Sequence, residues 1–189
     1  MPDGFAIRPG GDGDRAALAI LYPRAFPGED LLPLVRDLLD EADDVVSLVA
    51  IGNGRVLGHA VFTRCEATCE ADGIRHVALL GPLAVDPDHQ RRGIGTALLR
   101  EGMERVRAEG VERVCLLGDP AYYARHGFRP ETAIEPPYAL PPEWAPAWQS
   151  LGLVDEPRAE RRPSAPVRPS ASVRLRVPEP WRRPEYWAP

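Results

Sequence analysis

The stretch VDPDHQRRGIGTALLREG, residues 85–102, combines two arginines, two closely spaced glycines and the start of an amphipathic helix. The first turn of a helix carries unpaired N–H groups and a partial positive charge, and glycines there let a phosphate approach the backbone closely. Gly93 and Gly95, with Arg91 and Arg92 beside them, therefore predict an anion-binding cradle at a helix N-terminus. A plain junction between loop and helix, with a solvated arginine pair, is the alternative. A dinucleotide-binding turn is disfavoured, because a leucine holds the position of the third glycine in G-x-G-x-x-G.

The segments on either side of the glycines predict a strand, the helix itself and a second strand. The apolar run IRHVALLGPLAVDP, residues 74–87, predicts a long strand with a bulge or bend at Gly81-Pro82, since proline cannot donate to a strand ladder. Residues 95–109 predict an amphipathic helix, and ERVCLLGD, residues 112–119, predicts a short buried strand. A strand–helix–strand order of this kind implies a parallel crossover.

The N-terminal part of the chain predicts the rest of the sheet. Residues 45–65 contain two β-rich runs around Asn53-Gly54, which is the strongest short signal for a hairpin. FAIRP, residues 5–9, predicts a short strand, and residues 13–24 and 31–40 predict two helices. With this hairpin ahead of the parallel crossover, we expect the sheet to be mixed.

Charge and proline content change near residue 155. The stretch that follows is rich in proline and arginine and cannot form a regular element. Beyond it, SVRLRV alternates apolar and basic residues with the period of a half-buried strand, and three aromatic residues come after as packing anchors. We predict three parts: a domain over residues 1–154, a Pro/Arg-rich loop over 155–171, and a C-terminal strand and aromatic tail over 172–189 that returns to the domain.

The composition argues against several classes of function. The chain of 189 residues has a net charge of −5, which argues against general nucleic-acid binding. All 23 basic residues are arginine, so a Walker-type phosphate loop and a Schiff-base lysine are both excluded. No run approaches the ~18 apolar residues of a membrane span, and the N-terminus has no signal pattern, so we expect a cytoplasmic protein. Three cysteines without C-x-x-C spacing predict free thiols, and no metal site is expected.

Two motifs, in order along the chain, resemble the signature of the GNAT superfamily of N-acetyltransferases, and of its YhbS-like branch in particular. GPLAVDPDHQRRGIGTALL, residues 81–99, is similar to the family's acyl-CoA-binding motif, and Gln90 to Gly95 match Gln/Arg-x-x-Gly-x-Gly/Ala position for position. LGDPAYYARHGF, residues 117–128, is similar to the second motif, a tyrosine, three residues and then Gly-Phe. The resemblance implies an α+β fold, with a mixed, mostly antiparallel sheet and helices on both faces.

The resemblance also implies roles for named residues. Backbone N–H groups of Arg92, Gly93, Gly95 and their neighbours would hold the pyrophosphate of acetyl-CoA, the expected cosubstrate. The N–H of Leu83 would face the thioester oxygen as it gains charge, and Tyr123 would protonate the departing thiolate. The implied CoA-binding residues are Leu83, Ala84, Val85, Gln90, Arg91, Arg92, Gly93, Ile94, Gly95 and Thr96.

These roles imply direct transfer of an acetyl group to a primary amine of a small molecule or peptide, without an acyl-enzyme. A catalytically inactive acyl-CoA sensor and an enzyme for a longer acyl-CoA are the alternatives; a homodimer is left open, and neither nucleic acid nor a membrane is an expected partner. The motif's strand offers no acid, so the general base is unassigned: His76, His59, Glu66 and Glu29 are candidates, and a water chain or no base is an equal alternative. Tyr122 is interpreted as a core aromatic.

Overall fold

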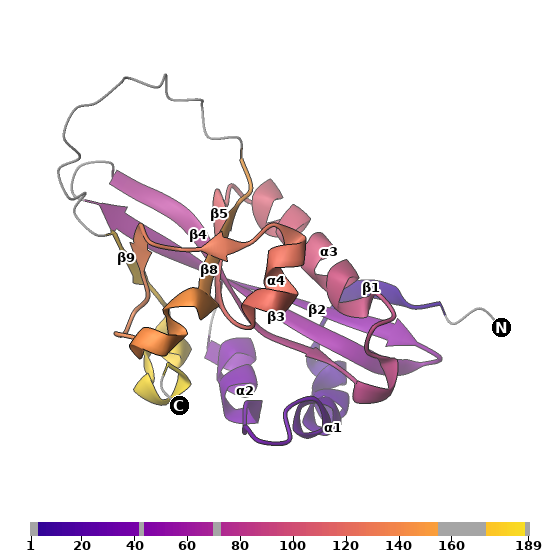
Figure 1. Ribbon diagram of the computed structural model, residues 1–189. Helices are drawn as coiled ribbons and strands as arrows, with labels where there is room; N and C mark the ends of the chain where they lie inside the picture. Colours follow the sequence, from indigo (N-terminus) through magenta and orange to yellow (C-terminus); the bar gives the residue numbers. More distant parts are fainter. Residues whose placement is uncertain (1–3, 42–43, 70–72, 155–172, 188–189) are drawn as a thin grey trace.

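The strands form a single mixed sheet that positions the rest of the molecule (Figure 1). The computed structural model describes residues 4–41, 44–69, 73–154 and 173–187. Within these ranges nine strands form the sheet, whose main path runs β1-β2-β3-β4-β5-β8-β6, while β9 pairs with both β3 and β7. The strands are β1 (Ala6–Pro9), β2 (Val45–Gly52), β3 (Arg55–Cys69), β4 (Gly73–Val85), β5 (Arg113–Leu117), β6 (Arg129–Pro130), β7 (Ile134–Glu135), β8 (Trp148–Gly152) and β9 (Val173–Arg176). The α-helices are α1 (Arg15–Ala25), α2 (Leu32–Glu41), α3 (Ile94–Ala108) and α4 (Pro120–Tyr123).

The strand pairing confirms the mixed, mostly antiparallel sheet. Of the strand pairs described, only β4–β5 and β7–β9 run parallel. Helix α3 connects β4 to β5, as the predicted crossover requires. The β2–β3 hairpin turns at Asn53 and Gly54, whose φ angles of 50° and 71° are both left-handed, as in the predicted two-residue turn.

Helices cover both faces of the sheet, which confirms the second part of the fold prediction (Figure 1). On one face α3 packs Leu98 against an apolar core that includes Phe62 of β3. Gly102 permits this close packing, because a β-carbon there would collide with the Phe62 ring. On the other face α1 and α2 cover a second layer of apolar side chains, in which Leu21 meets Val49 of β2. The sheet is therefore buried from both sides.

Strand β4 contains the predicted bulge at Gly81-Pro82. The ladder pairs Leu80 with Phe62 and Leu83 with Ala60, so two residues of β4 lie opposite one residue of β3. Leu80 and Leu83 consequently pack against the same core beneath α3, although strict alternation would send them to opposite faces. The bulge thus determines which way the last residues of β4 face.

The sheet opens between β4 and β5 after a short parallel contact. Residues 77–79 of β4 pair with residues 113–115 of β5. Beyond that point β4 stays paired with β3 as far as Val85, whereas β5 pairs with β8 as far as Leu117. The two parallel strands therefore diverge toward their carboxyl ends, which leaves the β5-facing edge of β4 without a strand partner beyond Leu79 among the described residues.

The C-terminal segment lies against the sheet on the side of α2 (Figure 1). Strand β9 pairs with residues 66–68 of β3 and buries Leu175, while Arg174 and Arg176 are exposed. The indole N–H of Trp181 donates to Thr63 Oγ1 at 3.0 Å, and that of Trp187 donates to the carbonyl of Trp181 at 2.9 Å. These contacts join the aromatic residues of the C-terminal segment to the core.

The division into residues 1–154, 155–171 and 172–189 stays a prediction. Residues 155–172, which include the whole of the expected loop, lie outside the described residues. None of the helices in the described ranges is long and apolar enough to cross a membrane.

Candidate active site

The N-terminus of α3 has the backbone geometry of an anion-binding turn. Gly93 precedes the helix with φ of 84°, and Arg91 has φ of 60°. A left-handed arginine is uncommon, and such residues concentrate at functional sites. The first helical bond runs from the N–H of Ala97 to the carbonyl of Gly93 at 2.9 Å. The preceding N–H groups therefore point out of the helix end, where turns of this type bind anions.

Asp86 anchors the loop that leads into this turn. Its carboxylate accepts from the backbone N–H of Asp88 at 3.0 Å and from Arg24 Nε, on α1, at 3.1 Å. Its own N–H donates to the carbonyl of Leu57 on β3 at 2.9 Å. Burial acts to raise the pKa of Asp86, but the bonds from Arg24, His89 and Asp88 outweigh it and hold the pKa below its ordinary value. The loop is thus fixed to both α1 and β3 by a charged, buried residue.

The two glycines of the motif occupy their positions for different structural reasons. Gly93 needs its left-handed φ, and a β-carbon there would meet nothing within 4 Å, so space for a ligand remains open. Gly95 has an ordinary helical position, but a β-carbon there would collide with the hydroxyl oxygen of Tyr122. The same β-carbon would lie 3.6 Å from Val85 Cγ2. The end of β4, the first turn of α3 and Tyr122 therefore meet at one place.

The tyrosine pair lies on the short helix α4. Asp119 is the N-cap residue of this helix, and its carboxylate accepts from the N–H of Ala121 at 2.8 Å. The Tyr123 ring meets the Phe128 ring edge-on at a centroid distance of 5.7 Å, and a β-carbon on Gly118 would touch it. Burial raises the pKa of Tyr123, with smaller contributions from Tyr122 and Asp119, so the phenol keeps its proton at neutral pH.

The structure brings most of the predicted site residues together where the end of β4, the start of α3 and helix α4 meet. Leu83, Val85, Tyr122 and Tyr123 are all partly buried against the same apolar core. The side chains expected to contact a ligand directly are exposed: Gln90, Arg91, Arg92 and Thr96. By contrast the side chains of Ala84 and Ile94 are buried, so only their backbone groups remain for a ligand.

Among the candidates for a general base, His59 is a structural residue. It is fully buried on β3, its Nδ1 lies 2.7 Å from the Tyr22 hydroxyl and its Nε2 lies 3.0 Å from Ser47 Oγ. Burial lowers its pKa to about 4, and the nearby carboxylate of Asp14 opposes this only in part. Both ring nitrogens are occupied within the fold, which leaves neither for an acceptor amine.

The other three candidates are exposed side chains. Glu66 and His76 face each other across the β3–β4 ladder, toward the end of β4 that is remote from Leu83. Glu29 lies between α1 and α2.

The sequence-based reasoning missed Tyr122 at the N-terminus of α3, and also Arg24 and Asp86 as anchors of the loop. The acidic residue directly after an apolar strand was the available signal for Asp86.

Buried, neutral His59 is expected to make stability depend on pH. The unfolded chain protonates this histidine below about pH 6.5, whereas the folded protein resists protonation down to about pH 4. The contribution of neutral His59 to the free energy of unfolding is therefore present above pH 6.5 and is lost as the pH falls toward 4. The expected loss is about 2 kcal/mol between about pH 7 and pH 5. Urea unfolding of the wild type and of His59→Gln should show a smaller loss in the variant, with the exposed His76→Gln as control. An equal loss in His59→Gln and wild type would contradict the assignment.

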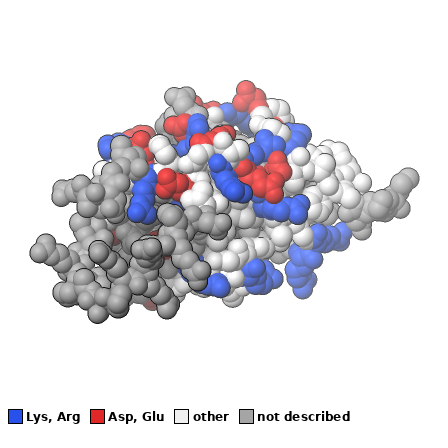
Figure 2. Space-filling view, turned by 90° about the horizontal axis from the view of Figure 1, so that it is seen from above, with Lys and Arg blue, Asp and Glu red and all other residues white. Residues whose placement is uncertain are grey.

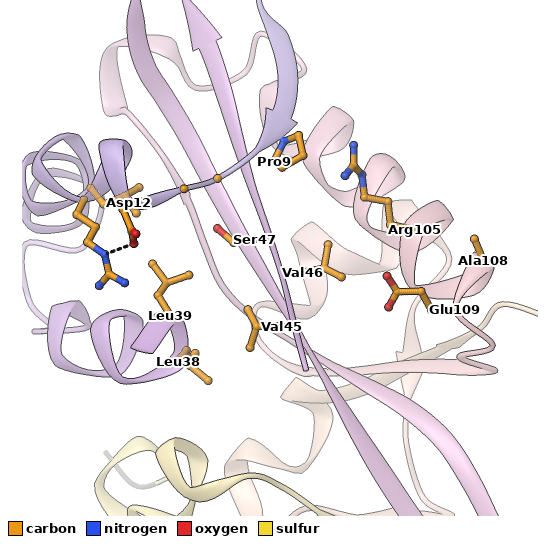
Figure 3. Close-up of a pocket in the computed structure, with 14 residues that line it drawn as sticks. Pro9, Asp12, Leu38, Leu39, Val45, Val46, Ser47, Arg105, Ala108 and Glu109 are labelled. Carbon is orange, nitrogen blue, oxygen red and sulfur yellow. Dashed lines mark hydrogen bonds and ion pairs between the residues drawn. The ribbon is translucent and has the colours of Figure 1, made fainter. Parts of the chain in front are cut away.

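A cavity of about 600 Å³ lies away from the helix N-terminus (Figure 3). Its walls come from the turn after β1, from α1 and α2, from the first residues of β2 and from the end of α3. Ser47 lies on this wall, and its hydroxyl oxygen is hydrogen-bonded to Nε2 of the buried His59 at 3.0 Å. The charged side chains of the wall have ion-pair partners, such as Arg105 with Glu101 at 2.8 Å. None of the predicted site residues lines this cavity.

The surface carries charged side chains of both signs (Figure 2). On the face shown in Figure 2, arginine and acidic side chains are interleaved. The described part of the chain contains no group of three or more His, Cys, Asp or Glu side chains placed to hold a metal ion.

A sheet that splays beside a glycine-bearing helix N-terminus, with a tyrosine helix across the opening, defines the class of acyl-CoA-dependent N-acyltransferases. Residues 15–128 match the sequence model of the Acetyltransferase (GNAT) family, and the chain belongs to that family. It is an N-acetyltransferase by this membership and by its relatives.

Two relatives and two solved structures support the assignment. The chain is 37% identical over 150 residues to the uncharacterized N-acetyltransferase YjhQ of Escherichia coli K12, covering 76% of this chain and 82% of YjhQ. It is 31% identical over 116 residues to the uncharacterized N-acetyltransferase YhbS of the same strain, covering 61% and 68%. The crystal structure of Escherichia coli YhbS with CoA superposes with a TM-score of 0.69 at 27% identity, covering 79% and 82%. The crystal structure of a GNAT family acetyltransferase from Brucella melitensis with acetyl-CoA superposes with a TM-score of 0.61 at 28% identity. The match covers 82% of this chain and 91% of that one.

Proposed function

We propose that this protein transfers an acetyl group from acetyl-CoA directly to a primary amine of a small molecule or peptide. The observation that carries the proposal is the divergence of β4 from β5, which occurs beside the unpaired N–H groups at the start of α3. Solved neighbours in the same family were crystallised with CoA and with acetyl-CoA. A cytoplasmic location stays a prediction, and a homodimer stays open.

The residues at the helix N-terminus fit a pyrophosphate. Gly93 leaves open space where a side chain would stand, and the left-handed turn at Arg91 directs backbone N–H groups outward. Exposed Gln90, Arg91, Arg92 and Thr96 add polar and charged groups around the same turn. The backbone of Leu83, Ala84 and Val85 would pair with the pantetheine arm where β4 diverges from β5, while Ile94 and Gly95 would contribute N–H groups.

The proposed chemistry assigns one role to each of two residues. Bound acetyl-CoA supplies an acetyl group that is already activated as a thioester. The N–H of Leu83 donates to the thioester oxygen as it gains negative charge, because Pro82 before it has no N–H. The amine nitrogen bonds to the acetyl carbon, the carbon–sulfur bond breaks and the ammonium loses its proton to solvent or to a base. Tyr123, whose phenol holds its proton at neutral pH, donates that proton to the leaving sulfur.

Binding and turnover together test the proposed function. Acetyl-CoA should raise the thermal midpoint of unfolding, because a ligand that binds only the folded state stabilises it by about 2.7 kcal/mol at a hundredfold excess over Kd. A panel of amines and peptides, monitored by release of the CoA thiol, should then identify acceptors. Absence of any thermal shift would refute the site. A shift without turnover across the panel would favour an acyl-CoA sensor, and turnover only with longer acyl-CoA would change the donor.

A further inference from the structure

The contact between Tyr122 and Gly95 joins two elements that the proposed function uses separately. Gly95 lies in the first turn of α3, where the phosphates would bind, and Tyr122 lies on α4 beside the proposed acid Tyr123. The inference below rests on the proposed function, since it concerns how the acid is placed relative to the CoA-binding turn.

The space beside Gly95 is filled by the protein itself. A β-carbon on Gly95 would collide with the Tyr122 hydroxyl oxygen, while the next ring atom, Cζ, would lie at an ordinary 3.6 Å. Gly95 is buried, whereas Gly93 is exposed and has open space beside it. Of the two glycines, Gly93 therefore suits close approach of a phosphate, and Gly95 suits the tyrosine.

The Tyr122 ring is held on several sides by its own helix and the turn after it. The Arg125 guanidinium lies over the ring at 5.0 Å from the centroid, and Arg125 Nε donates to the Tyr122 carbonyl at 3.4 Å. The His126 ring lies at a centroid distance of 5.2 Å. Tyr123 meets Tyr122 nearly perpendicular, with centroids 4.9 Å apart. A displacement of the Tyr122 ring would consequently be passed to Tyr123.

Helix α4 is too short to set its own position. It spans only Pro120–Tyr123, one turn, and a short helix of this kind depends on tertiary contacts for its placement. Tyr123 contacts Gly118, directly after β5, and the Phe128 ring, whereas Tyr122 contacts α3 through Gly95. The two tyrosines thus fix the helix from two directions.

We propose that Tyr122 is a positioning residue, whose hydroxyl seated against Gly95 sets the distance between the CoA-binding turn of α3 and the acid Tyr123. Gly95 is then required because a side chain there would push α4 away from α3. The presence of glycine in the motif is explained, at this position, by the enzyme's own tyrosine instead of by the ligand.

Three variants test the positioning role: Gly95→Ala, Tyr122→Phe and the double variant. Gly95→Ala should lower kcat at least about tenfold, since overpacking a filled site forces its neighbours to move, although alanine favours the helix more than glycine does. Tyr122→Phe removes the oxygen with which an alanine methyl at position 95 would collide, and it keeps the ring. We expect it to lower kcat only about threefold. The double variant should recover to the level of Tyr122→Phe, because the nearest remaining ring atom would make a normal contact. KM for acetyl-CoA should change less than kcat in each case.

The rescue separates the two explanations for Gly95. If the alanine methyl blocked CoA directly, the double variant would be as impaired as Gly95→Ala, with a raised KM for acetyl-CoA, and the positioning role would be overturned. An unimpaired Gly95→Ala would overturn it as well. Acetyl-CoA binding by the wild type, measured by calorimetry in the same series, distinguishes these failures from failure of the proposed function itself.

Discussion

Gly93→Asp is expected to weaken acetyl-CoA binding more than a hundredfold, whereas Gly93→Asn should weaken it far less. Asparagine and aspartate have nearly the same shape, and both tolerate the left-handed backbone that Gly93 adopts at φ of 84°. The two variants therefore share any backbone strain and differ by one negative charge. At about 5 Å from a phosphate and an effective dielectric constant of about 20, that charge costs roughly 3 kcal/mol, which is more than a hundredfold in Kd.

Calorimetric titration with acetyl-CoA at low and high salt checks this expectation. The gap between the aspartate and asparagine variants should narrow as salt rises, because the repulsion acts at an exposed position. Thermal unfolding without ligand should be similar for both variants, since a β-carbon at this position meets open space. Equal affinities for the two variants would show that the phosphates bind elsewhere.

Tyr123→Phe is expected to lower kcat about a hundredfold while the affinity for acetyl-CoA stays nearly unchanged. The substitution keeps the ring and its edge-on contact with Phe128 but deletes the only proton that the side chain can donate. General-acid assistance is typically worth about 10²–10⁴-fold, and a thiolate leaves readily enough to place this case at the lower end. The loss belongs to the transition state, so it should not appear in the binding of acetyl-CoA.

The comparison of Tyr123→Phe with Tyr122→Phe makes the assignment specific. Both variants lose one hydroxyl from the same short helix, yet only Tyr123 is proposed to reach the sulfur. Thiol release under saturating acceptor should fall far more in Tyr123→Phe. If Tyr122→Phe were the more damaged variant, the two roles would have to be exchanged. If both variants retained wild-type kcat, catalysis would proceed without an acid from this helix.

Local signals in the sequence predicted most of the fold. Asn53-Gly54 specifies a tight turn, Gly81-Pro82 interrupts a strand ladder, and the alternation around Leu175 specifies a half-buried strand. Each of these depends on neighbouring residues, so a single sequence suffices to recognise it. Alternation specifies which residues of a strand are buried, but not its partner, and the pairing of β9 with both β3 and β7 could not be predicted in that way.

The parts of the candidate site formed by residues adjacent in the sequence could be predicted. The parts formed by residues that only the fold brings together could not. The turn around Gly93 is encoded by adjacent residues, and its left-handed geometry agrees with the composition. The contact of Tyr122 with Gly95 joins segments on either side of β5, so the interpretation of Tyr122 as a core aromatic missed its hydroxyl at the helix N-terminus. His59 likewise needed the structure, because its partners Tyr22 and Ser47 come from α1 and β2.

The family-matched range, residues 15–128, does not contain all the strands of the sheet. A fragment cut to that range would lose β1, which pairs with β2, and β8, which covers the outer side of β5 through five residue pairs. It would also lose Trp148, Trp181 and Trp187, which lie in the core around Leu34 and Leu38. Losing β9 as well would leave unpaired edges on β2, on β5 and on residues 66–68 of β3. Unpaired strand edges beside an uncovered apolar surface form a template for aggregation, so a soluble fragment has to retain the segments before and after the recognisable family signature.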